Sequence, residues 1–286
     1  MVVCAAALIL SACSTVGVLN ALAPVDKISM HQGVAYEAGP RHQLDIYAPA
    51  AKDTHGAGGV PVVVFFYGGG WTSGDRSIYR FLGAALAARG VMVVVPDYRL
   101  YPEVKFPAYM YDAAAAVAWT RAHAAEFGGD PGRIFIMGHS AGGQIAGLLA
   151  LNDDYLKSVG LSPADLAGMI GLAGPYDFLP LTNPVYKVIF GPEDQWPKSQ
   201  PITYANAHAP PMLLVTGSSD DTVSPGNTQR LSARLRGLGD SVDVKVYPHI
   251  GHVTLMGAFS SQLAFLAPVR DDVLAFIAAR TATASR

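Results

Sequence analysis

The chain has 286 residues, a length that suits one large α/β domain better than two small ones. Apolar residues make up 51% of it and charged residues 15%, which is enough apolar material for a fully buried sheet and excludes a disordered chain. The net charge is −2 and no basic run occurs, so the sequence argues against nucleic acid as a partner.

The N-terminal segment, residues 1–13, differs from the rest of the chain. Its first ten residues are almost wholly apolar, and small residues then lead to Cys13. This pattern is typical of a bacterial lipoprotein signal, and the apolar run is too short to span a bilayer as a helix. We therefore expect an exported protein, periplasmic or attached to a membrane through a lipidated Cys13. The alternative is a frayed apolar helix on a cytoplasmic protein. Residues 14–30 are expected to be a tether.

Residues 31–286 are expected to form one domain in which strands and helices alternate. The predicted elements, in chain order, are an edge strand over 42–47, a strand over 61–67, a helix over 78–89, a strand over 91–95, a helix over 108–127, a strand over 134–137, a helix over 144–151, strands over 169–173 and 212–216, a helix over 229–238, a strand over 242–247 and a helix over 269–280. Continuous apolar runs are typical of strands covered on both faces. The order predicts an α/β fold with a doubly wound, mostly parallel sheet and helices on both faces.

The most informative pattern follows the strand at 134–137. Ser140 lies within a G-x-S-x-G sequence, and a run of small, helix-forming residues comes after it. A serine held between glycines at a strand-to-helix turn is the context of a nucleophile elbow, where a Cβ on either side would collide with neighbouring backbone. We therefore predict that Ser140 is a catalytic nucleophile.

A serine nucleophile needs a histidine base, and the base needs an acid that orients it. In doubly wound sheets such residues lie at the carboxyl ends of strands, in the chain order serine, acid, histidine. Asp220 and Asp221 follow the strand at 212–216, and His249 and His252 follow the last strand. We select Asp220 and His252 as the catalytic pair, with Asp221 expected in a solvated loop and His249 beside the site. His139 is expected to pack beside the serine.

Donors for a developing oxyanion are predicted at the end of the strand over 61–67. A run of three glycines there lets backbone N–H groups approach a negative charge without interference from side chains. We select the N–H groups of Gly69 and Gly70, together with that of Ala141, which follows the nucleophile. A plain flexible turn is the alternative interpretation of such a glycine run.

These motifs, in this order from about Leu44 onward, resemble α/β-hydrolases of the hormone-sensitive-lipase and bacterial feruloyl-esterase-like group. The residues that carry the resemblance are 68–71, 97–100, 106–108, 129–134, the elbow, 217–223 and 251–252. The family usually has a histidine where Tyr67 stands, and there it braces the oxyanion loop. The resemblance implies that the Tyr67 hydroxyl takes this place, with altered loop geometry. Asp97 and Arg99 are expected to form a structural ion pair or loop brace.

Substrate specificity depends on an aromatic- and proline-rich insert at about 175–210, which we expect to be a short lid over an apolar acyl pocket. Trp71, Tyr176 and Phe178 are the candidate pocket residues. The expected reaction is hydrolysis of carboxylic esters with small to medium acyl or aryl groups, without metal or cofactor. The alternatives are an amidase, formamidase or peptidase with the same triad and, more remotely, a non-catalytic binding protein. The sequence does not determine the oligomeric state.

Overall fold

The computed structural model describes residues 16–50 and 58–281, so the expected signal segment and Cys13 lie outside the described residues. The strands are β1 (Ile28–Ala35), β2 (Gln43–Pro49), β3 (Val60–Phe66), β4 (Met92–Pro96), β5 (Gly129–His139), β6 (Gly168–Leu172), β7 (Met212–Gly217) and β8 (Val242–Tyr247). The helices that bear on the argument are α2 (Arg80–Ala87), α3 (Ala108–His123), α4 (Ala141–Leu151), α5 (Asp153–Lys157), α6 (Pro184–Ile189), α7 (Gly226–Gly237), α8 (His252–Gly257) and α9 (Val269–Thr281).

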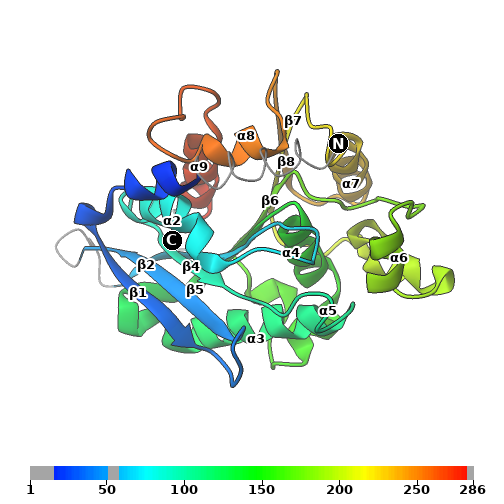
Figure 1. Cartoon of the computed structure of the whole chain (residues 1–286), viewed down its shortest axis with the longest axis horizontal. Helices are drawn as coiled ribbons and strands as arrows, with labels where there is room; N and C mark the ends of the chain where they lie inside the picture. Colours follow the sequence, from blue (N-terminus) through cyan, green and yellow to red (C-terminus); the bar gives the residue numbers. More distant parts are fainter. Residues whose placement is uncertain (1–15, 51–57, 282–286) are drawn as a thin grey trace, which may run out of the picture.

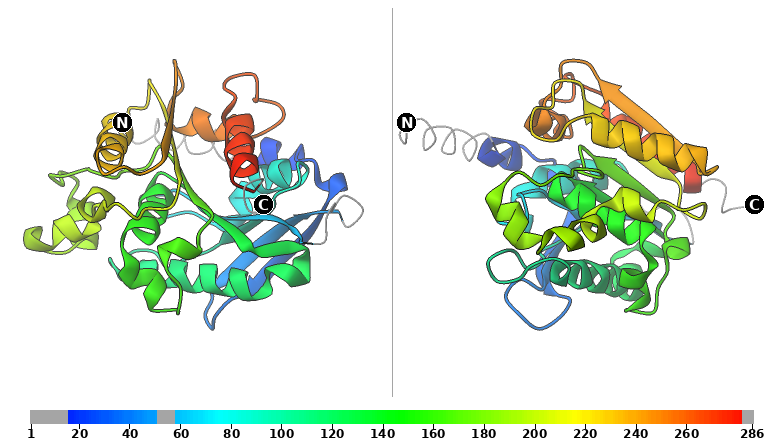
Figure 2. Two further views of the ribbon diagram at one scale, coloured as in Figure 1. Left: turned by 180° about the vertical axis from the view of Figure 1, so that it is seen from behind. Right: turned by 90° about the vertical axis from the view of Figure 1, so that its right-hand side faces the viewer.

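All eight strands form one sheet in the order β1-β2-β4-β3-β5-β6-β7-β8. The first two strands run antiparallel to their neighbours, and every pair from β4 and β3 through to β8 is parallel. Helices α3 and α4 pack on one face of the sheet, while α2 and α9 pack on the other (Figure 1 and Figure 2). The predicted α/β fold with a doubly wound, mostly parallel sheet is therefore confirmed.

The central strands are buried because helices cover both of their faces. In β3, Val62, Val63, Val64 and Phe65 are all fully inaccessible, and β5 from Ile134 to Met137 is equally enclosed. Such strands have no polar face, which is why their sequences are continuous apolar runs rather than alternating ones. This enclosed centre of the sheet gives β3 and β5 rigid carboxyl ends.

The N-terminal part of the domain differs from the expectation in two ways. Strand β1 begins at Ile28, so the segment expected as a tether over 14–30 contributes its last residues to the sheet, and Leu19 is buried in the core. The strand that was expected at the edge, β2, has β1 as an outer neighbour. Strand β1 was missed because most of its side chains are exposed or half-buried, so it has no apolar periodicity.

The insert between β6 and β7 contains α6 and two 3-10 helices, η6 (Glu193–Ser199) and η7 (Pro201–Tyr204). It lies beside α4 and α5, with α6 projecting outward (Figure 1).

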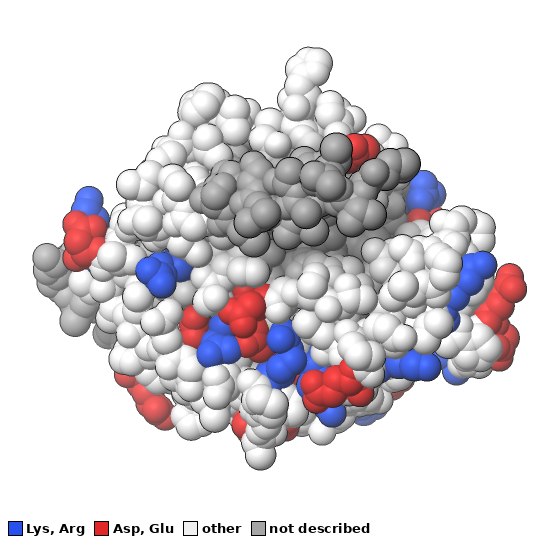
Figure 3. Space-filling view, viewed as in Figure 1, with Lys and Arg blue, Asp and Glu red and all other residues white. Residues whose placement is uncertain are grey.

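Among the described residues, no helix is both long and apolar enough to cross a membrane. On the face drawn in Figure 3, acidic and basic side chains are interspersed and no large area carries a single sign.

Candidate active site

Ser140 occupies a strained turn between β5 and α4. Its backbone has φ 53° and ψ −122°, and its N–H donates to the Leu172 carbonyl oxygen at 3.0 Å. The glycines around it are sterically required. A Cβ on Gly138 would lie 1.9 Å from the Gly142 carbonyl oxygen, and one on Gly142 would lie 2.0 Å from that of Phe66. The turn therefore exposes the serine side chain at the carboxyl end of the sheet, as in a nucleophile elbow.

Asp220 and His252 are joined by a hydrogen bond between His252 Nδ1 and Asp220 Oδ2 at 2.8 Å. The other carboxylate oxygen of Asp220 accepts the N–H groups of Thr222 and Val223. Burial opposes ionisation of Asp220, but the hydrogen bonds from His252 and these two N–H groups hold its pKa below the ordinary value. Asp220 is therefore an anion with both oxygens committed, and it orients the imidazole of His252.

The competing candidates lie elsewhere. Asp221 is exposed and its carboxylate contacts the hydroxyl of Thr222. His249 is exposed on the preceding turn, where its N–H donates to Ser218 Oγ at 3.0 Å. Of the two neighbouring acids and the two neighbouring histidines, the structure thus brings together the pair that the sequence argument selected.

His139 lies directly against His252, with ring centroids 4.5 Å apart. Neither ring nitrogen of His139 has a hydrogen-bond partner among the described residues. Burial, together with the neighbouring His252, lowers the pKa of His139 to about 3. The second imidazole of the site is therefore neutral throughout the working range of an enzyme and presents an uncharged ring to His252.

This buried imidazole makes stability depend on pH. Below about pH 6.5 the unfolded chain takes up a proton at residue 139, whereas the folded chain does so only near the lowered pKa. The free energy of unfolding should therefore fall between pH 7.5 and pH 5, by about 2 kcal/mol for this group. We expect His139→Leu to reduce this fall by about that amount, measured by urea denaturation at both pH values. Identical pH dependence in the two proteins would contradict the assignment.

The glycine run after β3 provides free backbone donors beside Ser140. The N–H groups of Gly69, Gly70 and Ala141 make no hydrogen bond in the part of the chain that the structure describes, and all three residues line the cavity that holds Ser140. Gly69 has φ +136° and a Cβ there would lie 2.0 Å from the Ser73 carbonyl oxygen, so no larger residue fits. The arrangement suits a developing oxyanion.

Tyr67 immediately precedes this glycine run, and its side chain is held in place by two hydrogen bonds and a stacked ring. Its hydroxyl donates to Asp97 Oδ1 at 2.7 Å and accepts from Arg41 at 2.6 Å, and its ring stacks on Tyr98. Asp97 is also paired with the guanidinium of Arg76. The hydroxyl is thus fixed by Arg41 and Asp97, and Arg41 also donates to the Gly74 carbonyl oxygen after the glycine run.

The expected ion pair between Asp97 and Arg99 is wrong. Arg99 instead binds the carboxylate of Asp112 on α3, at 2.6 Å, and Asp97 faces Arg41 and Arg76. The two residues are near in sequence, but the chain turns at the end of β4 so that they face different elements. Both remain structural, as parts of two separate charged clusters.

A cavity of about 940 Å³ opens in front of Ser140 and His252. Trp71 and Phe178 line it as expected, and their rings lie 5.9 Å apart. Tyr176 does not line it: its ring is fully buried and sits where a Cβ on Gly171 or Gly174 would fall. The assignment of Tyr176 to the pocket is therefore wrong, because the chain turns inward there and Asn227 Oδ1 accepts the Tyr176 N–H.

Three further residues, outside the predicted set of pocket residues, shape the cavity. Gln144 is fully buried and joins Trp71 Nε1, at 3.1 Å, to the Ser199 carbonyl oxygen, at 2.8 Å. Tyr186 on α6 lies edge-on to Trp71. Asn227 on α7 accepts two backbone N–H groups at the start of the insert. Of these three residues, only Gln144 is distinctive in the sequence, because it is a polar residue within the otherwise apolar helix α4.

Ser140 and His252 share the walls of this cavity, although the described contacts include no hydrogen bond between their side chains. The arrangement could support acyl transfer by a serine nucleophile with a histidine base. Over residues 16–50 and 58–281, no three His, Cys, Asp or Glu side chains gather in a way that could hold a metal ion.

Comparisons with known proteins find relatives over most of the chain. The family model BD-FAE matches residues 44–235. Among curated proteins, isoprenylcysteine alpha-carbonyl methylesterase ICME of Arabidopsis thaliana is 30% identical over 247 residues, covering 79% of this chain and 57% of that protein. Esterase LipC of Mycobacterium tuberculosis is 29% identical over 243 residues, covering 79% and 58%. The chain thus spans little more than half the length of these two relatives.

A solved structure shows the same architecture over nearly the whole chain. Esterase B from Lactobacillus rhamnosis superposes with a TM-score of 0.81 at 20% identity, covering 99% of this chain and 96% of that one. At this level of identity the likeness shows the fold.

Proposed function

The chain belongs to the BD-FAE family of α/β-hydrolases, and on that premise we propose that it is a serine hydrolase that cleaves carboxylic esters through an acyl-enzyme. One observation carries the proposal. His252, oriented by Asp220, and the elbow serine face the same cavity, beside three backbone N–H groups that make no hydrogen bond within the described residues. Relatives named as esterases support the same reaction class.

In the proposed first step, Ser140 Oγ attacks the ester carbonyl while His252 Nε2 takes its proton. Asp220 holds the tautomer of His252 that carries its proton on Nδ1 and stabilises the imidazolium that forms. The negative charge on the carbonyl oxygen is stabilised by N–H groups of Gly69, Gly70 and Ala141. The C–O bond then breaks, and the alcohol leaves with the proton from His252.

In the second step, water attacks the ester that links Ser140 to the acyl group. His252 now takes a proton from this water. As the tetrahedral intermediate collapses, the bond from the acyl carbon to Ser140 Oγ breaks, His252 donates its proton to Ser140 Oγ, and the acid departs. The neutral His139 ring beside His252 adds no competing positive charge to the imidazolium, because His139 stays unprotonated at neutral pH.

We propose that the insert over 175–210 acts as a short lid. Its residues Phe178, Leu181 and Tyr186 face the cavity opposite the glycine loop, and Gln144 ties the insert to Trp71. A cavity of this size, with walls on both sides, suits a small or medium acyl group.

A panel of p-nitrophenyl esters of rising acyl length tests the reaction and the cavity together. We expect kcat/KM to be highest for short to medium chains and to fall about tenfold or more for a dodecanoyl ester, which cannot lie wholly between the walls. An aryl ester and an N-formyl amide complete the panel. Turnover of the amide at rates above those of the esters would favour an amidase, and turnover of none would favour a binding protein.

A further inference from the structure

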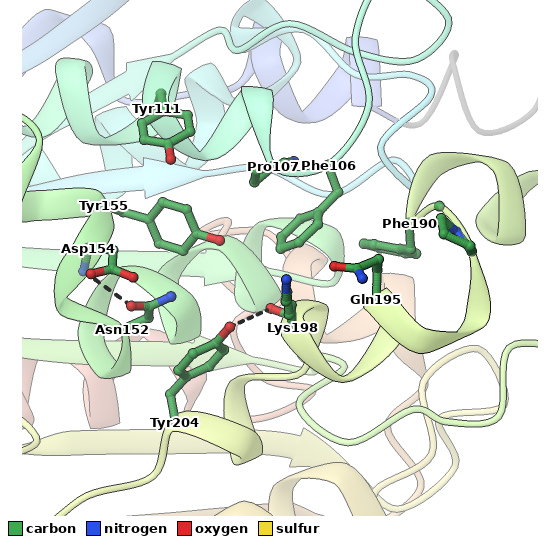
Figure 4. A pocket seen from close by; sticks show the side chains of 12 residues that line it. Phe106, Pro107, Tyr111, Asn152, Asp154, Tyr155, Phe190, Gln195, Lys198 and Tyr204 are labelled. Atoms are coloured by element: carbon green, nitrogen blue, oxygen red, sulfur yellow. Dashed lines mark hydrogen bonds between the residues drawn. The ribbon is translucent and has the colours of Figure 1, made fainter.

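A second cavity, of about 460 Å³, lies on the other side of the insert from Ser140. It is enclosed by the C-terminal end of α4, by α5, by the start of α3 and by residues 190–204 (Figure 4). None of its lining residues lines the Ser140 cavity. Phe190 separates the two, because one side of its ring packs against Trp71 and Phe178.

Several walls of this second cavity are aromatic rings. Phe106, Phe190 and Tyr204 border it on the insert side, and Tyr155 stands across from them with Tyr111 edge-on behind it (Figure 4). Flat apolar surfaces on several sides suit a ring-shaped ligand with apolar faces.

Two buried side chains present unused hydrogen-bonding groups to the cavity. Tyr155 is 5% exposed and Asn152 is 8% exposed. Within the described residues, the Tyr155 hydroxyl and the Asn152 amide nitrogen have no hydrogen-bond partner, and both point into the space shown in Figure 4. The amide oxygen of Asn152 is already used, since it accepts the Asp154 N–H at 3.1 Å. Both atoms are open to the cavity, since neither is among the fully enclosed polar atoms that lack a partner. A ligand that displaces water from them must therefore offer hydrogen-bond partners of its own.

The charges around the cavity balance. Asp154 and Lys198 are both exposed lining residues, one of each sign, and the side-chain oxygen of Gln195 adds a neutral acceptor. The site therefore offers no net attraction to an anion or a cation, while it offers donors and acceptors on several sides. Its ligand should be uncharged and should carry several hydroxyl groups.

We propose that this second cavity is a binding site for a neutral sugar ring in its pyranose form. The C–H faces of such a ring pack on the aromatic walls. Its hydroxyl groups form hydrogen bonds with Tyr155 and Asn152 and with the polar lining residues named above. A plain aromatic ligand would pack against the walls but cover these two donors without pairing with them. The site is separate from the ester-cleaving cavity and does not depend on Ser140.

Binding of methyl β-D-glucopyranoside and methyl β-D-galactopyranoside to the full chain tests the proposal, by isothermal titration and ligand-observed NMR. We expect saturable binding of at least one of them, with a dissociation constant on the order of 1 mM. Tyr155→Phe should weaken it about fivefold, because it removes only the hydroxyl. Asn152→Asp should weaken it similarly while keeping the oxygen that accepts the Asp154 N–H.

Tyr186→Phe is the matched control, because it removes a tyrosine hydroxyl from the other cavity and should leave sugar binding unchanged. Thermal unfolding verifies that each variant is folded. The proposal fails if neither glycoside binds, if binding survives both Tyr155→Phe and Asn152→Asp unchanged, or if only phenol and benzoate saturate the site.

Discussion

Replacing Ser140 by alanine should lower kcat for ester hydrolysis about 10⁶-fold, with little effect on folding. Alanine accommodates the positive φ of the elbow no worse than serine, since it has the same unbranched Cβ and lacks only the hydroxyl. What is lost is the oxygen that forms the acyl-enzyme, without which His252 and Asp220 have nothing to activate. Initial rates with a p-nitrophenyl ester, together with the thermal unfolding midpoint, measure both effects.

The matched control for this variant is Ser224→Ala. Ser224 lines the same cavity and is exposed, but it follows the acid-bearing loop, and its hydroxyl accepts the Gly226 N–H and, among the described residues, makes no hydrogen bond to His252. Its replacement should leave kcat within about threefold of the original. Retention of full turnover by Ser140→Ala would overturn the proposed mechanism.

Asp220→Asn should lower kcat about 10⁴-fold while the protein remains folded. The substitution keeps the size of the side chain, but an amide can turn its NH₂ group towards His252 Nδ1. The histidine then carries its proton on Nε2, which can no longer accept the proton of Ser140. The imidazolium also loses the anion that stabilises it. Steady-state kinetics at neutral pH measure this loss as a fall in kcat more than a rise in KM.

The neighbouring acid provides a control in the same loop. Asp221→Asn removes the same charge one residue later, where the carboxylate is exposed and accepts a hydrogen bond from the hydroxyl of Thr222. We expect its kcat to stay within about threefold of the original, because a solvated charge there is screened from the site. A larger loss in Asp221→Asn than in Asp220→Asn would reverse the assignment of the orienting acid.

The central strands and the elbow were predictable because burial on both faces imposes a local pattern. Helix-covered strands must be continuous apolar runs, and β3, β4, β6 and β7 match their predicted ranges within one or two residues. The elbow was predictable because Gly138 and Gly142 have no room for a Cβ. These constraints act on single residues or short runs, so they can be recognised in the sequence without knowledge of the rest of the fold.

Strand β1 and the short helices of the insert were not predictable in the same way. β1 is stabilised by pairing with β2, and its side chains carry no apolar period. Helix α6 has only six residues, and most of its side chains are exposed, so its sequence signal is weak. Their positions follow from packing against elements that are distant in the chain.

The sequence by itself determined the central strands of the sheet, the elbow at Ser140, and the choice of Asp220 and His252, since each follows from local burial, steric limits or strand-end position. The tertiary structure alone decided that Asp97 pairs with Arg41 and Arg76, that Arg99 pairs with Asp112, and that Tyr176 turns away from the cavity. It alone brought Tyr155 and Asn152 into a second cavity. The physical reason is that long-range packing sets the direction in which each backbone segment turns, and this direction decides which side chains meet and where cavities form. A local sequence pattern does not determine that direction.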